Sequence, residues 1–258
     1  MALVTFISDF GKEDHYVAAV KAAILQVNPN LNIIDISHNI QPFGLSHGAY
    51  ALRSVFRDFP KGTTHLVAID TFVKNWGALA IKLEDHFFVG PDNGILSLLS
   101  QERPSTVVDI NQLSPIESTF PAKDLYAAVA ANLASGKNIH EIGPKKDDWV
   151  QLLDRQIKAT KSLIAGNVVR IDNYGNLISN IPRTEFDQII KLNNGTPPSI
   201  RLGRERLNRI HSTYHDVEPG EIFCLFNQLG LLEIGINSGN ASELLGMDFD
   251  SPVSIHFE

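Results

Sequence analysis

The sequence predicts an α/β protein: a mostly parallel, Rossmann-like sheet sandwiched by helices, followed by an all-β barrel domain. In the first half of the chain, continuous apolar runs, typical of strands buried on both faces, alternate with helical patterns. In the second half, after a charged stretch, short strands are separated by Gly, Asn and Pro turns. We therefore expect an N-terminal domain over residues 1–143, a linker over 144–163 and a C-terminal β-barrel domain over 164–258.

The first element is a strand, a polar turn and an amphipathic helix over residues 3–25. Ser8 and Asp9 fall where the strand ends, and ligands of open α/β sheets bind at the carboxyl ends of the strands. The turn contains one glycine, Gly11, and no Gly-x-Gly-x-x-Gly pattern, so it does not indicate a dinucleotide site. Asp9 is the first candidate for a binding residue.

The rest of the N-terminal half continues the alternation of strands and helices. We expect strands at 32–36, 65–69 and 106–110, a hairpin formed by 78–83 and 86–89, and helices at 46–59, 95–101 and 122–134.

The C-terminal half reads as strands joined by polar turns. We expect strands at 166–171, 175–180, 199–202, 222–226, 231–236 and 253–257. The polar stretches 172–176, 227–230 and 237–241 are dense in hydrogen-bonding groups, and their composition alone indicates turns.

Composition limits the class of partner. The 258 residues carry a net charge of −7, which argues against a nucleic-acid partner and favours small molecules or proteins. Cys224 is the one cysteine, so neither an intramolecular disulfide nor a cysteine zinc site is expected. The chain has no signal-peptide pattern and no apolar run long enough to span a membrane, so we expect a cytoplasmic protein with no membrane contact.

Three carboxylates, Asp9, Asp35 and Asp70, fall at or near the ends of predicted strands. A lone aspartate at such a position is more often a cap, but several at one edge indicate a site. A di-metal hydrolase built on Asp9, Asp35 and His38 stays open as a minor alternative, although the nine histidines form no recognised metal motif. The first expectation is a site without metal.

Ordered motifs in both halves resemble a known family. These are Ser8-Asp-Phe-Gly11, Ile34-Asp-Ile-Ser-His38, the segment 88–96 (Phe-Val-Gly-Pro-Asp-Asn-Gly-Ile-Leu), the segment 171–181 (Ile-Asp-Asn-Tyr-Gly-Asn-Leu-Ile-Ser-Asn-Ile) and Leu232-Glu-Ile234. From about residue 3 to 257 the chain resembles the S-adenosyl-L-methionine hydroxide adenosyltransferases, the hydrolytic relatives of the fluorinase and chlorinase enzymes.

The resemblance implies cleavage of S-adenosyl-L-methionine to adenosine and L-methionine by attack of water on the ribose C5′, without a metal or other cofactor. It also implies a homotrimer, in which each substrate lies between the N-terminal domain of one subunit and the C-terminal barrel of the next.

The resemblance also assigns roles to residues of this chain. Asp9 would hold the ribose hydroxyls, and Asp70 would orient the water. Two aromatic residues would lie near the substrate, Phe43 and Phe120. In the second domain, the methionine end or the adenosine would be met by Asp172 and Asn176, and the carboxylate and adenine by Asn227, Gln228 and the backbone near Ser238.

The chain departs from the family pattern near the expected water. Pro121 stands where the hydrolases have a histidine, and no arginine follows Asp70 at the matching distance; Lys74 and Lys123 are the nearby positive charges. Proline offers neither a donor nor a base, and lysine does not reproduce arginine geometry. Two interpretations therefore stay open. Asp70 favours a hydrolase, and Pro121 favours a protein that binds the nucleoside without turnover.

Overall fold

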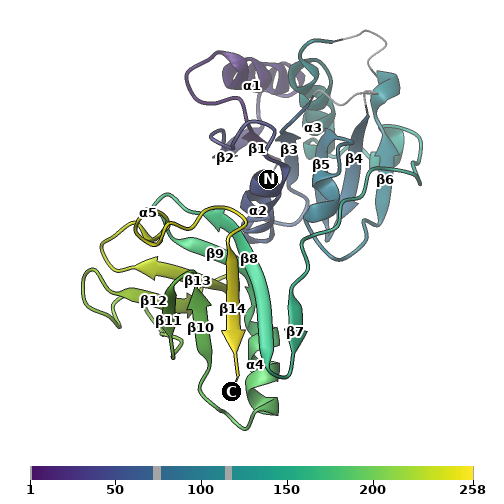
Figure 1. Ribbon diagram of the computed structural model, residues 1–258. Helices are drawn as coiled ribbons and strands as arrows, with labels where there is room; N and C mark the ends of the chain where they lie inside the picture. Colours follow the sequence, from purple (N-terminus) through teal and green to yellow (C-terminus); the bar gives the residue numbers. More distant parts are fainter. Residues whose placement is uncertain (1, 72–76, 114–117, 258) are drawn as a thin grey trace. The chain divides into compact units, whose positions relative to one another are not determined.

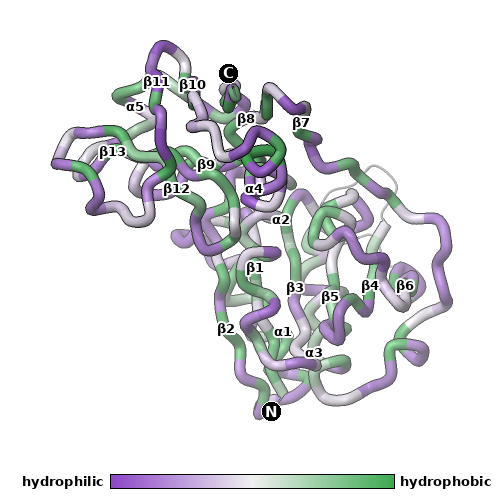
Figure 2. Tube along the Cα trace, turned by 90° about the horizontal axis from the view of Figure 1, so that it is seen from below, coloured by the Kyte–Doolittle hydropathy of each residue, from purple (hydrophilic) through white to green (hydrophobic). Residues whose placement is uncertain are grey.

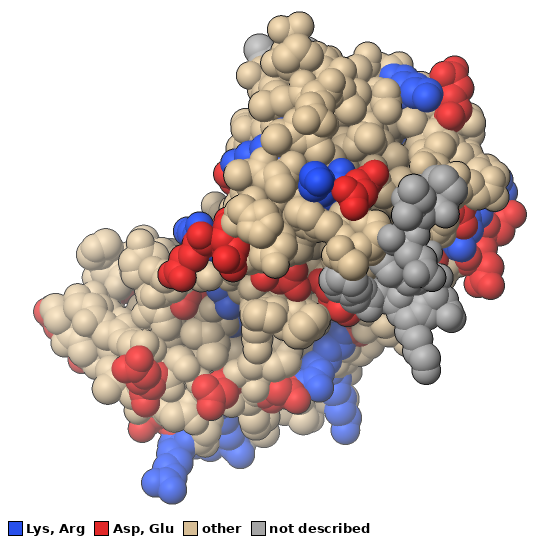
Figure 3. Space-filling view, turned by 90° about the horizontal axis from the view of Figure 1, so that it is seen from above, with Lys and Arg blue, Asp and Glu red and all other residues tan. Residues whose placement is uncertain are grey.

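The computed structural model describes residues 2–71, 77–113 and 118–257 (Figure 1). The chain divides into two compact units, Met1–Leu153 and Asp154–Glu258, and the boundary falls inside the charged stretch 144–163. No helix of the described residues is long and apolar enough to cross a lipid bilayer. On the face of the molecule in Figure 3, acidic and basic side chains are interspersed among uncharged ones.

The first unit contains a six-stranded sheet in the order β2-β1-β3-β5-β4-β6. The pairs β1–β2, β1–β3 and β3–β5 are parallel, whereas β4 pairs antiparallel with both β5 and β6. This confirms the α/β prediction, and β4 with β5 forms the expected hairpin. The strands are β1 (Leu3–Ser8), β2 (Asn32–Ser37), β3 (Thr64–Ala68), β4 (Ala78–Leu83), β5 (His86–Pro91) and β6 (Thr106–Asp109).

Helices cover both faces of this sheet. Alternate residues of β1 point to opposite sides: Phe6 packs in the apolar cluster that contains α1 (Tyr16–Val27) and α3 (Ala127–Ala134), and Ile7 packs in the cluster that contains α2 (Leu45–Arg53). Much of β1 and β3 is accordingly coloured hydrophobic in Figure 2. A sheet buried on both faces explains the continuous apolar runs of its strands.

The helices are shorter than the sequence pattern predicts. The predicted helix 46–59 ends as α2 at Arg53, because the Ser54 hydroxyl donates to the Tyr50 carbonyl and the next turn tightens into the 3₁₀ helix η1 (Phe56–Asp58). The predicted helix 95–101 is only the 3₁₀ turn η2 (Ile95–Leu98), and further 3₁₀ turns are η3 (Asn111–Leu113) and η5 (Ile139–Glu141). The predicted helix 122–134 begins as a π-helical turn, η4 (Ala122–Tyr126), before α3.

The second unit is a barrel-like antiparallel sheet in the order β11-β10-β14-β8-β9-β13-β12, with β7 added to β8. Its interior is an apolar cluster that includes Ile164, Leu202, Leu232 and Ile255. The prediction of an all-β barrel domain is confirmed, and its strands are antiparallel. The strands are β7 (Lys158–Thr160), β8 (Leu163–Ile171), β9 (Leu177–Pro182), β10 (Ser199–Leu202), β11 (Glu205–Leu207), β12 (Ile222–Phe226), β13 (Leu231–Ile236) and β14 (Pro252–His256).

Two helices of the second unit were not expected from the sequence. The longer, α4 (Arg183–Leu192), is mostly polar but buries Phe186 and Ile189 in the barrel cluster. The shorter, α5 (Ala241–Leu245), is capped by the Asn240 side chain, which accepts from the Glu243 amide. A helix that buries only one narrow apolar stripe gives a weak sequence signal.

A buried polar cluster joins three strands of the first unit. The Thr5 hydroxyl and His65 Nδ1 lie 2.7 Å apart, and His65 Nε2 lies 3.2 Å from His86 Nδ1. The His65 ring stacks on Phe88 with the centroids 4.7 Å apart. Burial, with a further contribution from His86, lowers the pKa of His65 to about 3.

Because of this lowered pKa, we expect the first unit to lose stability as the pH falls. The unfolded chain protonates this imidazole near pH 6.5 and the folded chain only near pH 3, so the loss spans the window between these values. Its slope is up to about 1.4 kcal/mol per pH unit. Urea unfolding at about pH 7 and about pH 5 measures it. Tryptophan fluorescence is the signal, because Trp76 and Trp149 both belong to residues 1–153.

The variant His65→Asn, which keeps an amide near Thr5, should reduce the difference in unfolding free energy between the two pH values. His215→Asn, at an exposed position in the second unit, is the control and should leave that difference unchanged. An equal pH dependence in His65→Asn and the wild type would contradict the assignment.

Candidate functional site

One carboxylate oxygen joins the loops that follow three parallel strands. Asp9, directly after β1, accepts through Oδ2 from the backbone N–H of Phe43 at 3.0 Å and from that of Asp70 at 3.1 Å. Its own N–H donates to the Ala68 carbonyl at 3.3 Å. The carboxyl ends of β1, β2 and β3 therefore meet at Asp9, as expected for the binding edge of an open α/β sheet.

The other oxygen of Asp9 faces no such donor. No residue in the described part of the chain donates a hydrogen bond to Oδ1. An ionised carboxylate has about four acceptor sites, and only two of them are used here. Asp9 can therefore hold its own loops together and still accept hydroxyl groups of a ligand.

The two residues that donate to Asp9 have unusual backbones. Phe43 has a φ of 62° and Asp70 a φ of 46°, in the left-handed region that side chains rarely adopt. The carbonyls of Ile69 and Asp70 each accept from the Asn93 side chain at 3.0 Å, which fixes the loop after β3. Strained residues of this kind concentrate at functional sites.

The side chains of Phe43 and Asp70 stand at the same edge. Phe43 is 70% exposed, so its ring presents an apolar surface to solvent. Burial raises the pKa of Asp70, and the negative charge of Asp9 adds to the rise. A carboxylate with a raised pKa is a better proton acceptor than an ordinary surface aspartate.

The third predicted carboxylate, Asp35, does not complete a triad with Asp9 and Asp70. Its Oδ2 lies 2.6 Å from Lys21 Nζ on α1, and its Oδ1 lies 3.1 Å from His38 Nε2. Burial raises the pKa of Asp35, but the hydrogen bonds from Lys21 and His38 outweigh it and the pKa is lowered. Expecting the three carboxylates to converge was wrong for Asp35, because this side chain faces α1.

The minor alternative of a metal site has no matching residue cluster. In residues 2–71, 77–113 and 118–257, no group of three or more His, Cys, Asp and Glu side chains could hold a metal ion. Asp35 and His38, which that alternative requires, are engaged with Lys21 and with each other.

Phe120 lies beside the loop that follows β1. Its ring contacts those of Phe10 and Tyr16, with centroids 5.7 Å and 5.3 Å away. Pro121 follows directly and is the N-cap of the π-helical turn η4. The exposed Lys123 side chain lies 3.7 Å from Asp124. Lys74 lies outside the described residues.

In the second unit, the predicted residues Asp172 and Asn176 form a self-contained turn between β8 and β9. Asp172 Oδ1 accepts from the N–H groups of Tyr174 and Asn176, both at 2.9 Å, and its Oδ2 accepts from the Asn176 amide at 3.1 Å. The hairpin turn indicated by composition is confirmed. Tyr174, at its tip, is 78% exposed.

The other predicted residues of this unit lie on two further turns. Asn227 Oδ1 accepts from the N–H groups of Leu229 and Leu231, while Gln228 is exposed. Ser238 is exposed, has a φ of 61° and donates its hydroxyl to Asn237. Such exposed polar groups can reach a ligand without rearranging the barrel.

Sequence reasoning missed Glu233 as a candidate. It is 4% exposed and accepts from the Asn227 amide at 3.1 Å. Burial raises its pKa, and the charge of Asp172 adds to the rise against the hydrogen bonds from Asn227 and Tyr214. Two carboxylates near one another favour a cationic ligand. The signal was present in the sequence as one acid inside the apolar run 231–236.

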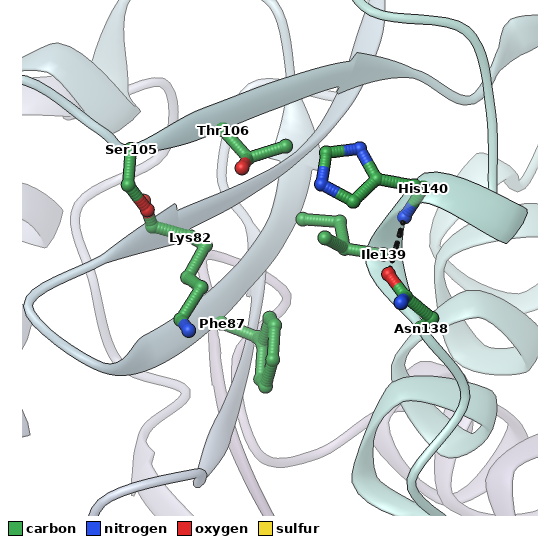
Figure 4. A pocket seen from close by; sticks show the side chains of 7 residues that line it. All are labelled: Lys82, Phe87, Ser105, Thr106, Asn138, Ile139 and His140. Atoms are coloured by element: carbon green, nitrogen blue, oxygen red, sulfur yellow. Dashed lines mark hydrogen bonds between the residues drawn. The ribbon is translucent and has the colours of Figure 1, made fainter.

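A pocket in the first unit lies away from Asp9 (Figure 4). It is lined by Lys82, Phe87, Ser105, Thr106, Asn138, Ile139 and His140. Lys82 pairs with Phe87 at the beginning of β5, so the pocket lies at the opposite end of the sheet from Asp9. We place the candidate site at Asp9 because acceptor groups and strained loops converge there.

We expect Asp9→Ala to destabilise the first unit by about 1 to 2 kcal/mol, because two backbone N–H groups lose their acceptor. Asp9→Asn keeps one oxygen and should cost less. Asp14→Ala changes an exposed carboxylate further along the same loop and serves as the control. Urea unfolding followed by tryptophan fluorescence measures all three. If Asp9→Ala matched Asp14→Ala, the carboxylate would not hold the loops together.

Comparison with known proteins identifies the family. Residues 4–143 match the SAM hydroxide adenosyltransferase N-terminal domain, and residues 166–254 match the C-terminal domain. A relative from Thermus thermophilus, named (R)-S-adenosyl-L-methionine hydrolase, is 30% identical over 99% of this chain and 100% of its own. A fluorinase from Actinoplanes sp. is 26% identical over 72% of this chain and 74% of its own. The crystal structure of an uncharacterized conserved protein from Thermotoga maritima matches with a TM-score of 0.88 at 31% identity, over 98% of this chain and 99% of that chain. As its motifs predict, the chain belongs to the S-adenosyl-L-methionine hydroxide adenosyltransferase family.

Proposed function

We propose that this protein hydrolyses S-adenosyl-L-methionine to adenosine and L-methionine. The observation that carries the proposal is the arrangement of Asp9 and Asp70: one oxygen of Asp9 fixes the loops, the other stays available for ribose hydroxyls, and the Asp70 carboxylate follows the same edge. The name of the Thermus thermophilus relative supports this choice of substrate.

The reaction needs alignment more than strong acid or base catalysis. Water attacks the ribose C5′, a C–O bond forms, and the C–S bond breaks with its electron pair going to sulfur. The sulfonium thereby becomes a neutral thioether, which is a good leaving group. The water loses a proton, and Asp70, whose pKa is raised, is placed to orient the water and accept that proton.

The remaining groups bind the two ends of the substrate. Asp9 accepts the ribose hydroxyls, and the aromatic rings of Phe43 and Phe120 provide apolar surface beside the sugar. The second unit binds the methionine end and the adenine through Asp172, Asn176, Asn227, Gln228 and Ser238. Glu233, near Asp172, adds a second carboxylate for the ammonium group of methionine.

A second candidate function is binding of the nucleoside without turnover. Pro121 favours it, because this residue is the N-cap of η4 and offers no side chain that could donate to or accept from a water. Asp70 favours the hydrolase. No metal or other cofactor takes part in either proposal.

We also propose that the protein is a homotrimer in the cytoplasm, with each site formed by the first unit of one subunit and the second unit of the next. The trimer follows from the family resemblance, and the candidate residues divide accordingly: Asp9, Phe43, Asp70 and Phe120 belong to the first unit and the others to the second.

For the hydrolase, we expect Asp70→Asn to lower kcat by roughly 100-fold or more with a small change in KM, because the amide cannot accept the proton of the water. Chromatographic detection of adenosine from S-adenosyl-L-methionine measures it. Asp85→Asn, an exposed acid on the hairpin turn between β4 and β5, should keep wild-type turnover. Wild-type protein that binds S-adenosyl-L-methionine and forms no adenosine would instead be the binding protein.

The trimer proposal predicts that two inactive variants complement each other. Asp70→Asn alters the first unit, and Asp172→Asn alters the second while keeping one oxygen for its turn. After subunit exchange in an equal mixture, about a quarter of the sites should combine two unaltered halves and regain activity. Light scattering checks the trimer. If subunits exchange and no activity returns, each site lies within one subunit.

A further inference from the structure

A series of polar contacts leads from α1 to the end of β1, directly before Asp9. The Ser8 hydroxyl lies 2.7 Å from His38 Nδ1, and His38 Nε2 lies 3.1 Å from Asp35 Oδ1. Asp35 Oδ2 in turn accepts from Lys21 Nζ at 2.6 Å. Ser8 is fully buried and His38 is 6% exposed, so neither is free to act as a nucleophile or a ligand.

The protonation state of the His38 ring follows from the groups that face its two nitrogens. Asp35, paired with Lys21, attracts a proton onto Nε2 of His38, although the angle of that contact departs from the hydrogen-bond ideal. Burial lowers the pKa of His38 against the raising effect of Asp35, which favours the neutral ring. Nδ1 then accepts from the Ser8 hydroxyl, whose oxygen can accept from the Phe10 N–H at 3.5 Å.

His38 holds the loop at both ends. Its side chain contacts Ser8, the residue directly before Asp9, and its carbonyl accepts from the Gly11 N–H at 2.8 Å. Gly11 has a φ of 75°, which lets the chain turn back at that point. The ring of His38 also packs edge-on against Phe6, with the centroids 4.6 Å apart. Asp9 and Phe10 therefore lie in a loop clamped by one residue of the neighbouring strand end.

An irregularity in the sheet brings His38 to this place. The pairing of β1 with β2 places Phe6 opposite Asp35 and Ile7 opposite Ser37, so Ile36 is an extra residue without a partner. Such bulges redirect the side chains that follow them.

We propose that His38, through Ser8, is a positioning residue that fixes the direction of the Asp9 carboxylate and thereby the preference of the site for a ribose with both hydroxyls. The inference rests on the proposed function, because the ribose is the ligand concerned. His38 itself would touch no substrate.

The test compares the binding of adenosine with that of 2′,3′-dideoxyadenosine to the full chain by calorimetry. The ratio of the two Kd values reports only on the hydroxyls, so a general loss of folded protein leaves it unchanged. The wild type should prefer adenosine by roughly tenfold or more, the range of a lost hydrogen bond to a charged group.

We expect His38→Leu to lose most of this preference through weaker adenosine binding, with the dideoxynucleoside little affected. His38→Asn should retain it, because an amide atom can take the place of Nδ1 opposite Ser8. His86→Leu is the matched control: it removes another buried histidine at the other end of the sheet and should leave the ratio unchanged.

If His38→Leu does not fold, Ser8→Ala decides, because it removes only the hydroxyl and should lower the ratio in the same way. A wild-type ratio in folded His38→Leu or in Ser8→Ala would overturn the positioning role. A wild type that itself shows no preference for adenosine would overturn the proposed ribose site, and the inference with it.

Discussion

The candidate site depends on one interaction: Asp9 Oδ2 accepts hydrogen bonds from two backbone N–H groups. It joins the loops after β1, β2 and β3, although Phe43 lies 34 residues and Asp70 61 residues from Asp9 along the chain. The sheet brings the strand ends to one edge, but it does not fix the direction of the loops beyond them. The carboxylate does so, and its second oxygen accepts no hydrogen bond from the described residues.

This arrangement has a conformational cost that other contacts offset. The N–H groups of Phe43 and Asp70 point at Asp9 from left-handed backbones, which cost of order 1 kcal/mol or more each for such residues. The charged acceptor and the two hydrogen bonds from Asn93 offset this cost in the loop after β3. The contacts of His38 stabilise the loop after β1. The same few contacts therefore stabilise the loops at this edge of the sheet and fix their direction.

The sequence predicts the strands and the meeting of Asp9 with Asp70, because apolar periodicity fixes which segments are strands and parallel strands end at one edge. It does not predict that Asp35 turns away, since that depends on which face of β2 packs against α1: Asp35 pairs with Phe6 on that face and binds Lys21 there. It also misses α4, whose apolar stripe is narrow, and Glu233, whose burial depends on contacts with Asn227 and Tyr214. Each missed feature depends on contacts between segments distant in the chain.

Because Ile36 has no partner in β1, the number of residues at the end of β2 matters as much as their identities. Because successive side chains of a strand point to opposite faces, one residue fewer between Asp35 and His38 would reverse the face to which the residues at the end of β2 point. Exchanging one apolar residue for another at position 36 preserves the geometry. A single deletion there would separate the imidazole from Ser8 while leaving every functional side chain present in the sequence. In this chain, the number of residues at the end of the second strand therefore matters to the site as much as their identities.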